Sequence, residues 1–363
     1  MIYFNKKIEE SIKSVSNLLE EIKPEEAIIL SHEDHDGLTS SVLFDVYLYN
    51  KYNKRIRIIH PTKESSYIEI FKQILRSRPK YLIILDALVS NYKNIIEKIL
   101  KYTIVINIDH HDILETQNEN YINLNPHKFG LEYINSSGLS WLILMKLDES
   151  YFEKRCWIAG IGAAQDYCIE DNYILFQELK RYGYLEDKNL EHLINSKIMK
   201  LAKMINAAIR EGKGDYTYNK LFYASLKNDP AILDNDNIFN ESYNDFIKNL
   251  ENVYKEFNEK KIEKDPFIFF NLNGRPIYYI TYISELEKKS KIYVGYSNGL
   301  LGFRSLFYNY DVRTLAKYYN GGGPHPKIAG GKTKKKFEEF IRDVYNIYSK
   351  ESKQKRLDIF LNY

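Results

Sequence analysis

The sequence predicts an α/β protein, a parallel-sheet domain followed by a smaller α+β domain. The first observation is the length of 363 residues, which exceeds the roughly 100 to 200 residues of a usual single domain. The second is the alternation of short apolar runs with helical stretches in the first half, typical of parallel strands buried on both faces. The third is a set of strand-like segments after residue 265, with helices behind them. We therefore expect domains at residues 1–185 and 265–363, joined by a connector at residues 186–264.

Residues 1–185 are expected to open with an amphipathic helix. Apolar residues recur at helical spacing from Ile8 to Ile22, and Pro24 ends the pattern. Unbroken apolar runs then predict the strands, which are residues 27–30, 81–85 and 104–108. The crossover helices are expected around residues 42–48, 68–75 and 95–100.

The rest of the chain changes character twice. Residues 186–264 are rich in Lys, Asn, Glu and Asp with scattered apolar residues, which predicts a helical connector with solvated faces. The later segment predicts strands at residues 267–271, 276–283 and 291–296. Asn273 and Gly274 supply a hairpin turn between the first two of these strands. A helix at residues 312–319, a glycine-rich loop at 321–332 and a helix at 337–348 complete the expected order.

Composition and charge exclude several classes of protein. A hydrophobic fraction of 44% with 28% charged residues is typical of a globular chain. The net charge is +3, so any nucleic-acid site must be a local basic cluster. Cys156 and Cys168 are the two cysteines and form no C-x-x-C pair, which excludes a thiolate zinc site and favours a reducing compartment. No apolar run nears the ~18 residues of a membrane span, so we expect a cytoplasmic protein without a membrane partner.

Side chains that can bind metals follow each predicted strand of the first domain. The carboxyl ends of parallel strands meet at one edge of a sheet, so these side chains are expected to converge. A carboxylate after a strand is, taken alone, more commonly a turn former or helix cap. Oxygen and imidazole donors without thiolate favour Mn²⁺ or Mg²⁺. The candidates are His32, Asp34, His35, Asp36, Asp86, Asp109, His110, His111 and, after a small-residue stretch, Asp166.

These motifs, in this order, resemble the DHH phosphoesterase superfamily. The resemblance includes Asp34 to Gly37, the lone Asp86, Asp109 to His111, and a late glycine-rich loop with His325. Residues 125–130 with Ser136, Ser137 and Gly138 are similar, more narrowly, to archaeal RecJ-like exonucleases. The resemblance covers residues 27–166 and 266 to about 341 and leaves the connector unmatched.

The resemblance implies a two-metal phosphodiesterase whose catalytic domain faces the smaller domain across a cleft. Two cations about 3.5 to 4 Å apart would activate a water and hold the attacking and leaving oxygens. The ligand positions that the resemblance implies are His32, Asp34, Asp36, Asp86, His110 and Asp166. Asp86 is expected to bridge the cations, and His32 is either a ligand or a residue that caps the loop.

Three further residues of these motifs have other expected roles. His35 is expected to point away from the metals and to be structural. Asp109 is expected to orient its neighbours. His111 is the candidate for contacting the scissile phosphate or the leaving oxygen.

The C-terminal domain is expected to bind the substrate. Successive glycines can expose backbone N–H groups to phosphate, and Arg304 and His325 would add donors. The loop departs from the family's usual G-G-G-H because Pro324 precedes His325. A lysine run beside the loop is either a solvated face or a set of backbone-phosphate contacts. The expected substrate-binding residues are Arg304, Gly321, Gly322, Gly323, His325, Lys332, Lys334, Lys335 and Lys336.

The leading hypothesis is a metal-dependent exonuclease on single-stranded DNA or RNA that acts in DNA replication or repair. It expects two divalent cations, with Mn²⁺ preferred and Mg²⁺ as the alternative. The resemblance implies a replicative helicase with GINS, or a repair helicase, as partner, and favours 5′→3′ digestion of DNA. One alternative is an oligoribonuclease or cyclic-dinucleotide phosphodiesterase. Another is an inactive helicase-associated scaffold, against which the intact set of ligand candidates argues.

Overall fold

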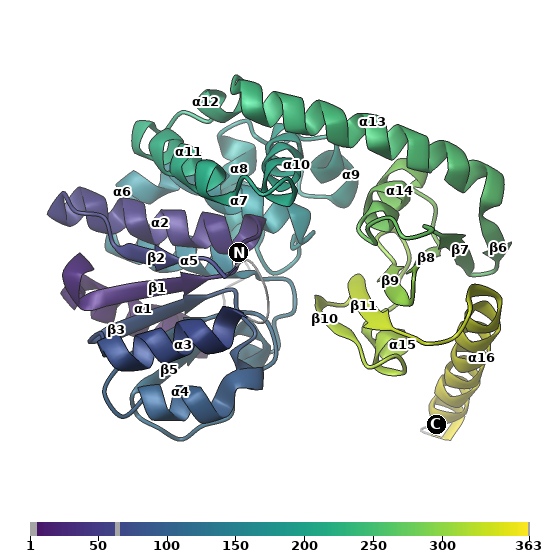
Figure 1. Cartoon of the computed structure of the whole chain (residues 1–363), viewed down its shortest axis with the longest axis horizontal. Coiled ribbons are helices and arrows are strands. Elements are labelled where there is room, and N and C mark those ends of the chain that lie inside the picture. Colours follow the sequence, from purple (N-terminus) through teal and green to yellow (C-terminus); the bar gives the residue numbers. More distant parts are fainter. Residues whose placement is uncertain (1–5, 62–65, 362–363) are drawn as a thin grey trace. The chain divides into compact units, whose positions relative to one another are not determined.

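The computed structural model describes residues 6–61 and 66–361 of the chain (Figure 1). The chain folds into two compact units, Met1–Asn244 and Asp245–Tyr363. Residues 186–244 of the expected connector thus belong to the first unit, and residues 245–264 to the second. None of the helices in the described ranges combines the length and apolarity needed to cross a membrane.

The first unit is built on a parallel five-stranded sheet with the order β2-β1-β3-β4-β5. The strands are β1 (Ala27–Ser31), β2 (Arg57–Ile59), β3 (Tyr81–Leu85), β4 (Ile104–Ile108) and β5 (Tyr121–Leu124). The three predicted strands are β1, β3 and β4, and they form the middle of the sheet. Their side chains alternate between two buried faces, so that Leu30 and Ile84 face one helical layer while Ile29 and Ile83 face the other.

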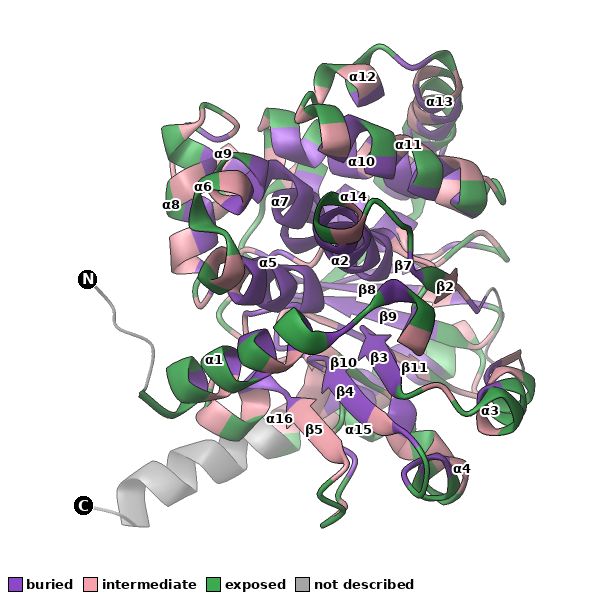
Figure 2. Cartoon of the chain, turned by 90° about the vertical axis from the view of Figure 1, so that its left-hand side faces the viewer, coloured by how far each residue is buried: buried purple, intermediate pink, exposed green. Residues whose placement is uncertain are grey.

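Helices cover both faces of this sheet. On one face, α3 (Ser66–Ser77) and α4 (Lys93–Ile99) pack against strand residues such as Ile28 and Leu82. On the other, α1 (Lys6–Glu21), α2 (His35–Tyr52) and α5 (Ser136–Leu147) contact the strands. Figure 2 shows α2, α5 and α7 (Cys156–Gln165) buried, whereas α3 and α4 turn exposed faces outward.

A further helical layer covers α2, which explains why α2 is buried on nearly every side. Helices α7, α10 (Lys197–Arg210) and α11 (Gly214–Lys227) contact α2 directly. The other helices up to residue 260 are α6 (Glu149–Phe152), α8 (Tyr173–Arg181), α9 (Leu190–Ile194), α12 (Ala231–Asp234) and α13 (Asn237–Lys260).

The second unit contains a mixed six-stranded sheet with the order β10-β11-β9-β8-β7-β6. Within this sheet, as far as its strands are described, β7 and β8 pair in parallel and the other neighbours are antiparallel. Its elements are β6 (Ile262–Lys264), β7 (Phe267–Asn271), α14 (Tyr279–Glu287), β8 (Ile292–Ser297), β9 (Leu300–Arg304), α15 (Arg313–Lys317), β10 (Gly322–His325), β11 (Ile328–Lys332) and α16 (Phe337–Leu361). Helices α15 and α16 pack on one face of the sheet.

The predicted strand at residues 276–283 is wrong, because this segment enters α14. Strands β7 and β8 are parallel, and parallel neighbours need a crossover connection rather than a hairpin. Asn273 and Gly274 do form a turn, with φ of 51° and 83°, but the turn leads into the crossover helix.

The predicted glycine-rich loop at residues 321–332 is also wrong, because it forms a hairpin of β10 and β11. A Cβ on Gly321 would lie 1.9 Å from the Gly330 carbonyl oxygen, and one on Gly323 would lie 2.3 Å from that of Ile328. These glycines therefore allow the two backbones to approach closely, which is a reason for glycine apart from any ligand.

Candidate metal centre

The loop between β1 and α2 positions the first two carboxylates. Asp34 is the N-cap of α2, and its Oδ1 accepts hydrogen bonds from the backbone N–H groups of Asp36 (3.1 Å) and Gly37 (3.0 Å). A Cβ on Gly37 would lie 2.2 Å from the His32 carbonyl oxygen. The glycine of this motif therefore lets the first turn of α2 pack against the backbone of His32.

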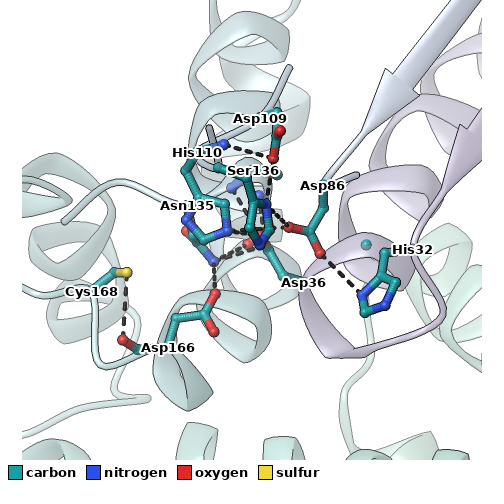
Figure 3. A network of polar contacts seen from close by, with 12 residues as sticks. His32, Asp36, Asp86, Asp109, His110, Asn135, Ser136, Asp166 and Cys168 are labelled. Atoms are coloured by element: carbon teal, nitrogen blue, oxygen red, sulfur yellow. Dashed lines mark hydrogen bonds and ion pairs between the residues drawn. The ribbon is translucent and has the colours of Figure 1, made fainter. Parts of the chain in front are cut away.

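Asp86 lies between two groups of donors at the end of β3. Its backbone adopts φ of 53°, in the left-handed region that non-glycine residues seldom occupy, and its N–H donates to the Ile108 carbonyl at 3.1 Å. Asp86 Oδ1 lies 3.1 Å from His110 Nε2, and Oδ2 lies 3.8 Å from His32 Nδ1. Figure 3 shows the carboxylate between these two imidazoles. The two oxygens of one buried carboxylate thus face two different imidazoles, with other donor side chains beside each.

Donor side chains lie on both sides of Asp86. On one side, His32 Nδ1 lies 2.9 Å from Asp34 Oδ2, and these two residues with Asp86 bring one donor atom each within 4.8 Å of one another. On the other side, His110 Nε2 lies 3.7 Å from Asp36 Oδ2. The predicted convergence of strand ends is therefore present in the first unit.

Asp166 reaches the same region from the C-terminal end of α7. Its Oδ1 lies 3.2 Å from His35 Nε2, and its Oδ2 accepts from Asn135 Nδ2 at 3.3 Å. The expectation that His35 points away is wrong. As the first residue of α2 it is buried, and its ring lies against the carboxylate of Asp166.

Asp109 organises the turn after β4. Its Oδ1 accepts from the backbone N–H of His110 at 2.8 Å and lies 2.7 Å from His111 Nδ1. Asn125 adds a hydrogen bond from its Nδ2 to the His111 carbonyl at 2.8 Å. The two histidines differ in access, because the His110 side chain is 2% exposed and that of His111 is 28% exposed.

The carboxylates strongly perturb one another. Burial raises the pKa of Asp86 well above its usual range, and repulsion from Asp34 and Asp36 raises it further. Burial, with repulsion from Asp166 and Asp34, raises the pKa of Asp36 to about 7. A divalent cation would relieve this repulsion, and oxygen with imidazole donors suits Mn²⁺ or Mg²⁺. The residues present therefore fit a centre for such cations.

The histidines compensate part of this charge. Burial is the largest single influence on His35 and lowers its pKa, but Asp166, Asp34 and Asp36 together outweigh burial and raise the pKa to about 9. In the same way, burial lowers the pKa of His111, but Asp109 with Asp34 and Asp166 outweighs burial and raises the pKa to about 9. Attraction to Asp34 also raises the pKa of His32, and a cation that binds to this imidazole must displace its proton.

Three residues hold Asp36, of which the sequence reasoning missed Asn135 and gave Ser136 and Ser137 only as part of a resemblance, without a role in the site. Ser136 and Ser137 donate their backbone N–H groups to Asp36, and Asn135 donates its side-chain amide. These residues begin a helix instead of ending a strand, so the rule of strand ends does not find them. The available signal is Asn-Ser-Ser-Gly, a sequence typical of a helix N-terminus.

In the second unit, the Arg304 side chain is hydrogen-bonded to residues of its own domain. Arg304 Nε donates to Thr281 Oγ1 at 2.6 Å, and its Nη1 donates to the carbonyls of Phe303 (2.8 Å) and Ala329 (2.9 Å). His325 ends β10, opposite Ile328.

The four lysines of the predicted run are not equivalent. Lys335 Nζ forms an ion pair with Asp343 Oδ2 at 2.6 Å. Lys332 ends β11, and Lys334 and Lys336 lie in the segment between β11 and α16.

Comparison with known proteins matches part of this centre, without Asp166, to a known domain. Residues 26–156 match the DHH family, N-terminal domain, which contains the loop after β1, Asp86 and the turn after β4. This match agrees with the resemblance to the DHH superfamily that the sequence motifs predicted. A search of curated proteins found no match.

Solved structures extend the likeness to most of the chain. The RecJ of Thermus thermophilus in complex with Mn²⁺ has a TM-score of 0.68 and 17% identity, over 94% of this chain and 55% of that one. An exonuclease RecJ bound to manganese has a TM-score of 0.60 and 18% identity, over 93% of each chain. The pGpG-specific phosphodiesterase PggH of Vibrio cholerae has a TM-score of 0.51 and 13% identity, over 89% of this chain and 99% of that one. The fold is thus RecJ-like, and the chain spans about half the length of the Thermus protein.

Proposed function

We propose that this chain is a two-metal phosphodiesterase that degrades single-stranded nucleic acid from an end. The observation that supports the proposal most directly is the placement of Asp86, whose two oxygens face His110 and His32. One shared carboxylate between two donor sets is the arrangement that a two-cation site requires.

The donors divide into two groups around Asp86. His32 and Asp34 would hold one cation together with Asp86, and Asp36, His110 and Asp166 would hold the other. The pair of cations would lower the pKa of a water and offset charge on the attacking and leaving oxygens. Mn²⁺ is the preferred ion of the proposal, since two RecJ structures with this fold contain manganese.

His111 is proposed to act on the substrate. Asp109 fixes its Nδ1 side at 2.7 Å, and the ring remains partly exposed. An imidazole with a raised pKa carries its proton at neutral pH, so His111 can donate a hydrogen bond or a proton to the scissile phosphate or the leaving oxygen.

The substrate proposal is single-stranded DNA or RNA, with 5′→3′ digestion of DNA. It is supported by the RecJ-like fold and by the lysine run of the second unit. The finer proposal is a cytoplasmic enzyme of DNA replication or repair that works with a replicative helicase and GINS, or with a repair helicase.

A second candidate is a phosphodiesterase for short substrates. This chain covers 99% of the length of PggH, whose name specifies pGpG. The same centre could hydrolyse either substrate class, since bound cations would act at the scissile bond that both classes share. The classes therefore differ in how strongly the rest of the strand contributes to binding.

Digestion of two substrates separates these candidates. A single-stranded 20-mer and a dinucleotide such as pGpG are incubated with the full chain and Mn²⁺, and again with excess chelator. The proposal expects a higher kcat/KM on the 20-mer and loss of all cleavage with chelator. Faster cleavage of the dinucleotide would favour the second candidate, and no cleavage of either would favour the scaffold.

A further inference from the structure

Asn135 contacts two of the proposed ligands at once. It lies immediately before α5 and is fully buried. Its Nδ2 donates to Asp36 Oδ1 at 2.8 Å and lies 3.3 Å from Asp166 Oδ2. These two aspartates come from different helices, and Figure 3 shows the amide between them.

We infer that Asn135 is a positioning residue that holds Asp36 and Asp166 together for the cation that they share. The inference rests on the proposed metal centre. The two carboxylates repel each other, and an amide that donates to both reduces this repulsion before a cation binds. The ligands are then already in place, so less free energy is lost in arranging them.

The surroundings determine which way the Asn135 amide points. Its Oδ1 accepts from the Gly138 backbone N–H at 3.2 Å and from Asn172 Nδ2 at 3.3 Å. Asn172 is held in turn, since its Nδ2 also donates to the carbonyls of Tyr133 (3.1 Å) and Cys168 (3.0 Å). A flipped amide would direct its oxygen at the two carboxylates, so the nitrogen faces Asp36 and Asp166.

The first turn of α5 completes the support of Asp36. The backbone N–H of Ser136 donates to Oδ2 at 2.9 Å, and that of Ser137 donates to Oδ1 at 2.8 Å. Both oxygens of Asp36 are thus held by the N-terminus of a helix, whose dipole favours negative charge. With Asn135, three donors fix the plane of this carboxylate.

Helix α7 packs against the Asp36 carboxylate from another side. A Cβ on Gly162 would lie 2.9 Å from Asp36 Oδ1 and 2.2 Å from Ser137 Oγ. Glycine at this position lets α7, which carries Asp166 at its end, approach Asp36. Asn135 therefore lies where α2, α5 and α7 converge, in a suitable place to set the spacing of their two ligands.

The test must separate this role from helix capping, because Asn135 also caps α5. Serine caps a helix about as well as asparagine but lacks the amide. Asn135→Ser is therefore expected to keep the melting temperature near that of the wild type. Its affinity for Mn²⁺ should fall by about 10- to 100-fold, the usual effect of removing a residue that orients metal ligands. Isothermal titration of the metal-free full chain with Mn²⁺ measures this without any substrate.

The matched control is Asn189→Ser. Asn189 caps α9 by accepting from the His192 N–H at 3.0 Å, and none of its described contacts is with a proposed ligand. This variant should bind Mn²⁺ like the wild type.

Asn172→Ala is a second test of the positioning role, because it leaves the Asn135 cap of α5 intact and frees the Asn135 amide to rotate. It should weaken Mn²⁺ binding by a smaller factor, and it carries the test if Asn135→Ser does not fold.

Unchanged Mn²⁺ affinity in folded Asn135→Ser would overturn the inference and leave Asn135 as a helix cap. Equal Mn²⁺ affinities of Asn172→Ala and the wild type would also overturn the inference. If the wild-type chain itself bound no Mn²⁺, the metal centre would be refuted, and the positioning role with it. The two failures are therefore distinguishable in one set of titrations.

Discussion

Asp86 is the residue on which the proposed centre depends most. Replacing it with asparagine keeps the shape but removes the charge that two cations would share. We expect Asp86→Asn to abolish hydrolysis and to weaken binding of both cations, because a bridging carboxylate contributes to each. The fold should persist, since the change relieves repulsion from Asp34 and Asp36.

The measurement for Asp86→Asn is turnover of a single-stranded 20-mer together with Mn²⁺ titration. Asp112→Asn is the control, because Asp112 is an exposed aspartate close by in the sequence. Turnover near the wild-type value at saturating Mn²⁺ would refute the bridge.

His111 and His110 are neighbours with different expected roles. His111→Ala should retain both Mn²⁺ ions but lose about 100-fold or more in turnover, the usual contribution of a positioned proton donor. His110→Ala is the comparison and should lose Mn²⁺ affinity. Calorimetry on both variants decides the assignment, and loss of one Mn²⁺ in His111→Ala would show that His111 is a ligand.

The residues of this centre were predictable to different degrees. Asp86 and Asp109 follow apolar strands, and the carboxyl ends of parallel strands meet at one edge, so their convergence could be derived from the sequence. The direction of the His35 ring could not, because it depends on where α7 ends in space. Asn135 was hidden for a related reason, since a helix cap has the same sequence signal whether or not a carboxylate lies in front of it.

At the scale of elements, α14 shows where strand propensity misleads. Residues 276–283 are rich in Tyr and Ile, which favour strands, and a turn precedes them. Yet Ile280 and Ile283 are fully buried at helical spacing. The parallel pairing of β7 and β8 needs a crossover, and tertiary structure therefore overrides local preference.

The strands β2 and β5 were missed for another reason. They are the two edges of the first sheet, with three and four residues, and most of their residues are only partly buried or exposed. Unbroken apolar runs mark strands that are covered on both faces. Edge strands lack that signal, so only the central strands could be derived from the sequence.

The end of α13 makes a pH-dependent contact within the second unit. Hydrogen bonds from Lys260 and Arg275 lower the pKa of Glu256 to about 2. A lowered pKa in the folded state means that the contact stabilises above about pH 4.5 and that this stability is lost as pH falls toward 2. Glu256→Gln should therefore lower the free energy of unfolding at pH 7, by at most about 1 kcal/mol for a pair near the surface. The difference in the free energy of unfolding between Glu256→Gln and the wild type should shrink as the pH approaches 2.

Hydrogen exchange of peptides from residues 245–350 measures this stability separately from that of the first unit. Glu251→Gln is the control, an exposed glutamate on the same helix. An equal effect of the two substitutions at every pH would contradict the assigned role of Glu256.

At the scale of the whole molecule, the distribution of charge matters more for nucleic-acid binding than the net charge does. A net charge of +3 over 363 residues gives little general attraction to a polyanion. Binding of a long strand must then come from local groups, of which the lysine run is the clearest. The ion pair of Lys335 with Asp343 removes one of its four charges from direct competition for phosphate.

The last prediction follows from this division of the lysines. Each phosphate contact on a single strand contributes roughly 0.7 to the slope of log affinity against log salt. Changing Lys332, Lys334 and Lys336 to Gln together should flatten the slope by up to about 2 units. Lys335→Gln is the matched control and should change it little. Binding should weaken nearly equally for all base sequences, because phosphate contacts position a strand without reading it.

The measurement is binding of a labelled single-stranded 20-mer between about 50 and 200 mM salt, with Asp86→Asn as the background to prevent cleavage. A dinucleotide is too short to reach beyond the scissile bond and its neighbours, so its cleavage by the triple variant with Asp86 intact should remain near wild type. An unchanged slope in the triple variant would show that the run is a solvated surface. It would also move the assignment of this chain toward a phosphodiesterase of short substrates, since the proposed binding of a longer strand depends on these lysines.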